Sequence, residues 1–157
     1  MFKRRQIFIC LIVLAFIIVA SCQSTGLADG EIAEIPEMTV KIGEDSYTVY
    51  HGAYSIEKRE GGSMTVETTD AASPNQIAET FTPFPVNLSD NVEIDLDGDP
   101  QIQVLEWDEN GHIGEIEIDD QSFTLPDEPG EMIIEVVGTW KNAEASFTFV
   151  VDIGESD

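Results

Sequence analysis

The feature that most constrains the fold of this chain is an alternation of apolar and acidic residues in its second half. Val92, Ile94 and Leu96 alternate with Glu93 and Asp95. Alternation with a period of two puts apolar side chains on one face of a half-buried β-strand. The same period recurs along the ranges 116–118, 132–136 and 147–153. Short strands with turn residues about every 8–12 positions predict an all-β chain folded as an antiparallel β-sandwich.

One expected strand changes its phase partway along. Ile102 and Val104 alternate, whereas Leu105 and Trp107 follow out of step, and this shift predicts a β-bulge. Phe123 and Leu125 indicate a further short strand before the turn at residues 126–130.

The first half of the chain gives weaker β signals. Residues 38–42 and 47–50 flank the turn sequence Gly43–Ser46 and predict a hairpin. A further strand is expected at residues 63–68, after Gly61 and Gly62. Residues 70–80 read as a long polar loop with a helical turn after Pro74. The pattern leaves open whether residues 38–69 extend the sandwich or form a separate ribbon.

The order of the expected strands in the second half of the chain is similar to that of a known class of domain. Residues 85–153 resemble immunoglobulin-like domains, with Val92–Leu96 as strand B, Trp107 on strand C, Met132–Trp140 as strand F and Ala145–Ile153 as strand G. The resemblance implies an Ig-like core over about residues 85–153, with residues 86–88 as strand A, residues 122–125 as strand E and a buried Trp107. The paired cysteines are absent, and Met132 stands where the tyrosine corner would place a tyrosine.

Charge excludes one class of partner. After residue 21 the chain has four basic residues against all 31 acidic ones, a net charge of −27. So acidic a body repels phosphate backbones, which disfavours nucleic-acid binding, and it should also stand away from anionic lipid headgroups.

The N-terminus has the layout of an export signal. Lys3, Arg4 and Arg5 precede a 14-residue apolar run, residues 7–20. A membrane-spanning helix needs about 20 apolar residues, so this run fits the apolar region of a signal peptide better. An uncleaved anchor and an ordinary signal peptide are the alternatives.

The apolar run ends in Val19-Ala20-Ser21-Cys22, which resembles the lipobox of bacterial lipoproteins. The resemblance implies cleavage between Ser21 and Cys22 and lipid attachment to the Cys22 thiol, so that the membrane lipid is a partner and the protein sits on the extracytoplasmic face of the cell membrane. Two acyl chains anchor a protein stably, whereas one binds only marginally. Cys10 would leave with the signal, so the mature chain would contain no disulfide.

These readings divide the chain into three parts. Residues 1–21 are expected to be a lipoprotein signal peptide, residues 22–37 a lipidated cysteine with a flexible acidic tether, and residues 38–153 the β-sandwich. The stretch P-x-x-P-G-E-M-I-I-E-V-V-G-T-W, which begins at Pro126, is similar to the C-termini of small, uncharacterised lipoproteins of Gram-positive bacteria.

Few residues of the sequence indicate a catalytic, metal or cofactor site. His51 and His112 have no second histidine or cysteine at ligand spacing, and no nucleophile motif or phosphate-binding loop occurs, so neither a metal site nor a cofactor is expected. Asp95, Asp97 and Asp99 suggest calcium binding, but their spacing does not match an EF-hand loop, and a solvated acidic loop is the simpler reading.

Aromatic residues give the remaining candidate for a binding surface, unless they fill a second layer of the sandwich: Tyr47, Tyr50, Tyr54, Phe81 and Phe84. The sequence therefore favours a non-catalytic binding module of the cell envelope, with an envelope protein or polymer as partner. A calcium-responsive adhesion or envelope-structural domain is the alternative, and a small carboxylate-based hydrolase is a second, less favoured one.

Overall fold

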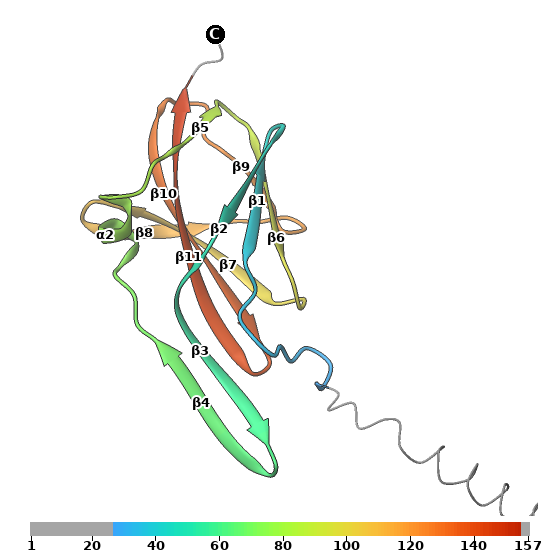
Figure 1. The fold of residues 1–157 in the computed structure, drawn as a ribbon. Coiled ribbons are helices and arrows are strands. Elements are labelled where there is room, and N and C mark those ends of the chain that lie inside the picture. The colour runs from blue at the N-terminus through green and yellow to red at the C-terminus, as the bar shows by residue number, and fades with distance from the viewer. Residues whose placement is uncertain (1–26, 155–157) are drawn as a thin grey trace, which may run out of the picture.

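The computed structural model describes residues 27–154, which form two packed β-sheets and one short helix (Figure 1). The expected antiparallel β-sandwich is thereby confirmed. The signal peptide and the lipobox, including Ser21 and Cys22, lie outside the described residues. Within residues 27–154, no helix has both the length and the apolar character needed to span a membrane.

The smaller sheet has four strands in the order β2-β1-β6-β9. Strands β1 (Met38–Ile42) and β6 (Asn91–Leu96) pair antiparallel at its centre, and β2 (Asp45–Val49) and β9 (Ser122–Thr124) form its edges. The β1–β2 turn has only two residues, because Gly43 adopts a φ of 58° that favours glycine. The turn is therefore shorter than the range Gly43–Ser46 expected from the sequence.

The larger sheet runs in the order β4-β3-β11-β10-β7-β8. Its strands are β3 (His51–Glu60), β4 (Ser63–Thr69), β7 (Gln101–Asp108), β8 (Gly111–Ile116), β10 (Gly130–Trp140) and β11 (Ala143–Gly154). A further short strand, β5 (Phe84–Asn87), pairs parallel with the last residues of β11. Strands β3 and β5 thus share one side of β11, β3 at its start and β5 at its end.

The core lies between the two sheets and is built on β10 and β11. The inward side chains of these strands, Ile134, Val136, Phe147 and Phe149, have no solvent exposure, as the alternating pattern predicted. They meet the apolar residues of β1 and β6 from the other sheet. Burying apolar area of this kind is the main favourable term in folding.

The two tryptophans differ from the expectation. Trp107 is not in the core: it lies on the outer face of the larger sheet, opposite Ile133, and is only partly buried. Val104 points inward from the same strand, so Leu105 and Trp107 point outward without any break in the pairing with β10. The predicted bulge is present, but on the β8 side, where the register shifts between Glu106 and Trp107.

Trp140 is the buried tryptophan, with an exposed fraction of 5%. Its Nε1–H donates a hydrogen bond of 2.9 Å to the Asp97 carbonyl oxygen. Gly98 beside it adopts a φ of 87°, and a Cβ at this position would lie 2.7 Å from Trp140 Nε1. The loop between β6 and β7 therefore packs directly on the indole, which leaves no room for a side chain at Gly98.

Part of the observed strand order is the order that the Ig-like resemblance implied. The sequence β11-β10-β7 corresponds to strands G, F and C, and β6 pairs with β9 as strand B pairs with strand E. One assignment is wrong: β5, expected as strand A, pairs with β11, and β1 takes the place beside β6. Residues 38–69 extend both sheets, because the chain crosses from β2 to β3 at Tyr50.

The polar stretch before β5 contains the expected helical turn, α2 (Pro74–Ala78). Gln76 Oε1 accepts a hydrogen bond of 3.2 Å from the Ser73 backbone N–H at the start of the helix. The helix contacts β7, β10 and β11 on the outer face of the larger sheet, where Thr148 and Val150 of β11 are buried. A covered outer face explains why β11 buries side chains on both of its faces at these positions.

The chain from Gly30 to Ile35 is held against the sandwich at the β10–β11 turn. Ile32 and Ile35 pack on the core, and the side chain of Asn142 in that turn bonds both the N–H and the C=O of Ile32 at 2.9 Å. The expected tether thus docks on the body before residue 37. We call this end of the molecule the proximal end, and the end holding β5 and Gly154 the distal end (Figure 1).

Strands β3 and β4 continue past the proximal end as a two-stranded hairpin. Ile56 pairs with Ala143, the first residue of β11, so residues 57–66 extend beyond the sheet, and we call them the arm. Gly61 and Gly62 form its turn with φ of 55° and 87°, as in the two-residue turns that favour hairpins. The seven residues of β4 are all exposed.

Candidate binding surface at the open edge of the sandwich

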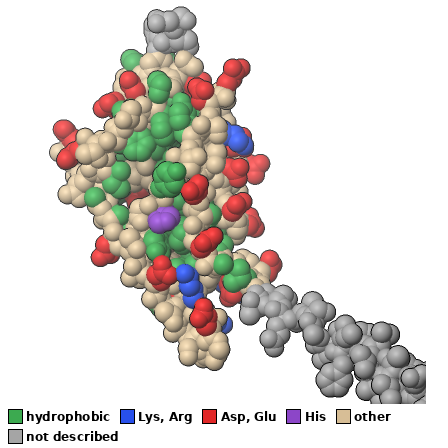
Figure 2. Space-filling view, in the orientation of Figure 1, with side chains coloured by type: hydrophobic (Ala, Val, Ile, Leu, Met, Phe, Trp, Pro, Cys, Tyr) green, Lys and Arg blue, Asp and Glu red, His purple; other side chains and the backbone are tan. Residues whose placement is uncertain are grey.

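The main candidate surface is a group of aromatic rings where the two sheets meet at one open side. Tyr47 of β2 stacks on Phe84 of β5 with ring centroids 4.0 Å apart and planes 13° from parallel. Phe81 meets Phe84 edge-on at 5.2 Å. We call these three residues the aromatic edge. Figure 2 shows apolar side chains gathered over the region where β2, β5 and β11 meet.

The aromatic edge packs on the core on its inner side and is partly exposed to solvent on its outer side. Phe149 of β11 is fully buried and stacks against Phe84 at a centroid distance of 6.1 Å. Tyr47, Phe81 and Phe84 are themselves only partly buried. A rigid apolar surface of this kind can take a partner's apolar group without first ordering its own side chains.

Acidic groups border the aromatic edge. Burial raises the pKa of the Tyr47 hydroxyl above its usual value, and the nearby carboxylates of Asp45 and Asp90 raise it further. The phenol is therefore a neutral donor at physiological pH. The edge combines aromatic faces, a hydroxyl and flanking carboxylates, a combination that suits a neutral or cationic polar ligand better than an anionic one.

The three tyrosines do not form one surface. Tyr50, at the crossing between the sheets, is 69% exposed, whereas Tyr47 belongs to the aromatic edge. Tyr54 of β3 donates a hydrogen bond of 2.8 Å to Glu67 Oε1 and meets His51 edge-on at 4.9 Å. Sequence reasoning could not separate them, because it did not identify residues 51–60 as a strand of the other sheet.

The three aspartates considered for calcium are also dispersed. Asp95, the penultimate residue of β6, is exposed on the outer face of the smaller sheet. Asp97 accepts a hydrogen bond from Trp140 at its carbonyl oxygen, and Asp99 adopts a φ of 52° in the loop. Among residues 27–154, no group of three or more histidine, cysteine, aspartate or glutamate side chains is placed to hold a metal ion.

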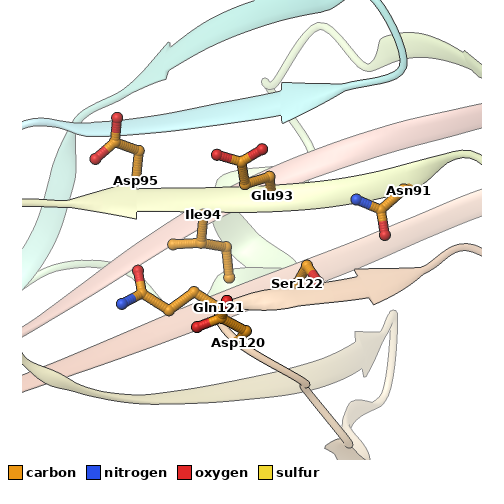
Figure 3. A pocket seen from close by; sticks show the side chains of 7 residues that line it. All are labelled: Asn91, Glu93, Ile94, Asp95, Asp120, Gln121 and Ser122. Carbon is orange, nitrogen blue, oxygen red and sulfur yellow. The ribbon is translucent and has the colours of Figure 1, made fainter.

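Asp95 instead lines a shallow polar hollow with residues before and in β9 (Figure 3). Its other lining residues are Asn91, Glu93, Ile94, Asp120, Gln121 and Ser122. Asp120 and Gln121 adopt φ of 46° and 63°, and the Gln121 carbonyl oxygen accepts a 2.9 Å hydrogen bond from the Ile94 N–H. The backbone hydrogen bond and these two φ angles fix the conformation of the residues that line the hollow. None of its lining residues is a buried polar side chain that could bind a ligand.

A second polar cluster lies on the outer face of the larger sheet. Trp107 Nε1–H donates a hydrogen bond of 2.9 Å to Glu135 Oε2, and His112 meets the Trp107 ring edge-on at 5.8 Å. Burial raises the pKa of Glu135, while the bond from Trp107 and the charge of His112 oppose that rise. Sequence reasoning missed this cluster, because it placed Trp107 in the core.

Comparisons of the chain with protein-family models, with characterised proteins and with solved structures found no match.

Proposed function

We propose that this protein is a lipid-anchored, extracytoplasmic binding module without catalytic activity, and that the aromatic edge is its binding surface. Its expected partner is a protein or polymer of the cell envelope. The observation that carries the proposal is the stacked Tyr47–Phe84 pair, which is partly exposed and rests on the buried ring of Phe149.

The anchor is supported by the sequence. The cationic start, the apolar run and Val19-Ala20-Ser21-Cys22 resemble a lipoprotein signal, and Cys22 would carry the lipid. The docked stretch Gly30–Ile35 then makes the proximal end the membrane-facing end.

The position of the aromatic edge fits such an anchor. Phe149 and the β5 partner Val151 lie six to eight residues along β11 from Ala143 at the proximal end. At about 3.3 Å per residue, the edge stands roughly 20–26 Å beyond that end. An anchored molecule would present the aromatic edge outward, toward the envelope.

Co-sedimentation tests the binding surface. The mature full chain is mixed with an insoluble preparation of Gram-positive cell-wall polymer, and the bound fraction is measured for the wild type and for Tyr47→Ala. We expect retention of the wild type and a loss of most binding in Tyr47→Ala, because the substitution removes one face of the stacked pair.

Tyr54→Phe is the matched control, since Tyr54 lies on the arm side and bonds Glu67. Melting curves of both variants establish that each is folded. Equal retention of Tyr47→Ala and Tyr54→Phe would contradict the assignment of the aromatic edge. A wild type that stays in solution would contradict binding to the wall polymer.

A further inference from the structure

We propose that the arm, residues 57–66, lies on the lipid surface and inserts Met64 and Val66 at its interface, so that the module is held upright on the membrane. The inference rests on the proposed anchor at Cys22 and adds a second contact with the same membrane. It is carried by three features of the arm: its place at the proximal end, its exposed apolar side chains and its local charge.

The arm and the anchored chain share one end of the molecule. Asn142 joins them directly: its Nδ2–H₂ donates to the Ile32 and Glu57 carbonyl oxygens at 2.9 and 3.0 Å. The Glu57 N–H in turn donates to the Asn142 carbonyl oxygen at 2.8 Å. Figure 1 shows the β3–β4 hairpin pointing away from the distal end, at the end of the molecule where the described chain begins.

The chain beyond the docked stretch is too short to lift this end far from the bilayer. Gly30 lies eight positions after Cys22, and eight residue steps can span at most about 28 Å. The arm itself runs four residues from Glu57 to its turn, which is about 13 Å in a strand. The arm therefore covers nearly half of the largest possible gap.

One face of the arm has the composition of an interfacial contact. Met64 and Val66 are 57% and 54% exposed, and their cross-strand partners Arg59 and Glu57 place one basic and one acidic group on the same face. On the other face Lys58 is paired with Glu67 at 2.7 Å. Exposed apolar side chains beside a basic one are typical of segments that lie in a membrane interface.

The arm is also a segment where repulsion from an anionic surface is weak. Residues 57–66 contain two basic and two acidic residues and are neutral together, whereas the chain after residue 21 has a net charge of −27. The same excess of negative charge argues against a second copy of this chain as the occupant, since two such molecules repel each other. A lipid surface that meets only the arm avoids most of this repulsion.

The test uses the acylated mature protein in vesicles of phosphatidylglycerol and phosphatidylethanolamine. Met64→Cys is labelled with an environment-sensitive fluorophore, since Cys22 would be blocked by its lipid and Cys10 removed with the signal. Ile113→Cys on β8 is the matched control, because Ile113 has the same exposed fraction of 57% outside the arm. Quenching by nitroxide-labelled lipid measures contact with the bilayer.

We expect severalfold stronger quenching at position 64 than at position 113, and weaker quenching at position 64 after Arg59→Glu. Equal quenching at the two positions in acylated, vesicle-bound protein would overturn the orientation and leave the anchor intact. Protein without lipid on Cys22 would overturn the anchor and this inference together. Disulfide cross-linking between two molecules of the unlabelled Met64→Cys variant on the vesicles would assign the arm to self-association instead.

Discussion

At the scale of the residue, Asn142 determines how the N-terminal chain meets the sandwich. Its side chain makes three hydrogen bonds: it accepts one from the Ile32 N–H and donates to the carbonyl oxygens of Ile32 and Glu57. The side chain therefore joins three segments that are far apart in the sequence: the docked stretch, the β10–β11 turn and the base of the arm. Asn142 thus links the parts of the proximal end, together with the hydrogen bond from the Lys141 N–H to the Gly30 carbonyl oxygen.

Asn142→Ala should destabilise the fold by about 1–3 kcal/mol, because it removes these bonds and leaves partly buried backbone groups unpaired. Denaturant unfolding measures the loss, and hydrogen exchange should quicken at Ile32. Asn110→Ala in the exposed β7–β8 turn is the control, and an equal loss of stability in both variants would contradict this role of Asn142.

Glu135 gives a prediction of pH dependence. Burial raises its pKa in the folded state, so the fold binds this proton more tightly than the unfolded chain does. The extra stability that the fold gains by binding this proton is fully present below the ordinary pKa of a glutamate. It is lost as the pH rises through the raised pKa of Glu135 in the folded state. We therefore expect the unfolding free energy of the wild type, relative to Glu135→Gln, to fall from about pH 4 to pH 7.

Urea titrations of the two proteins across this pH range measure the difference. Glu131→Gln supplies the control, since Glu131 is exposed on the same strand. The prediction would be contradicted if the difference in unfolding free energy between the wild type and Glu135→Gln stayed constant with pH. It would also be contradicted if Glu131→Gln showed the same pH dependence, since burial would then not set the proton affinity of Glu135.

At the scale of the element, the strands with alternating residues could be predicted and the others could not. Strands β6, β10 and β11 each bury one face against the opposite sheet. The inward residues Val92, Ile134 and Phe149 therefore belong to alternating patterns that can be recognised in the sequence. β3 was missed, because only Ile56 of its ten residues is buried and the strand continues into a solvated arm. A period of two requires one buried face, and most of β3 has none.

The same reasoning explains the errors in the candidate site. Trp107 was expected in the core because the Ig-like resemblance implies a buried tryptophan on strand C, but this residue lies on the outer face of the larger sheet, part of which α2 covers. The pairing of Tyr47 with Phe84 joins two strands 37 positions apart in different sheets. No local pattern reports a contact between two sheets, so the aromatic residues could be nominated from the sequence but not grouped.

The arm should behave as a separate element. Beyond Glu57, which bonds Asn142, the strand pairing of the arm within the described part of the chain is confined to its own hairpin, so its opening need not disturb the sandwich. Gly62→Ala should strain the turn by about 1 kcal/mol, because Gly62 has a φ of 87°. Hydrogen exchange should quicken in residues 58–66 while β10 and β11 keep their protection.

Gly114→Ala is the matched control, since neither glycine has an atom within 4 Å of an added Cβ and only Gly62 has a positive φ. Global unfolding of Gly62→Ala at the temperature of the exchange experiment would contradict the independence of the arm.

At the scale of the whole molecule, the fold separates two ends. The docked stretch and the arm lie at the proximal end, and the aromatic edge lies toward the distal end. Three of the four basic residues after residue 21, Lys58, Arg59 and Lys141, lie on the arm or on the adjoining turn. The two ends of the molecule thus differ in structure and charge. A lipid at Cys22 would place the proximal end at the membrane and the aromatic edge away from it.

The central claim, that the module is anchored through Cys22, is tested most directly by mass spectrometry of the N-terminal peptide of the mature protein. The account predicts that this peptide begins at Cys22 and carries a diacylglyceryl group with its acyl chains, and that Cys22→Ala abolishes the modification. A mature peptide that begins at another residue, or one that begins at an unmodified Cys22, would contradict it.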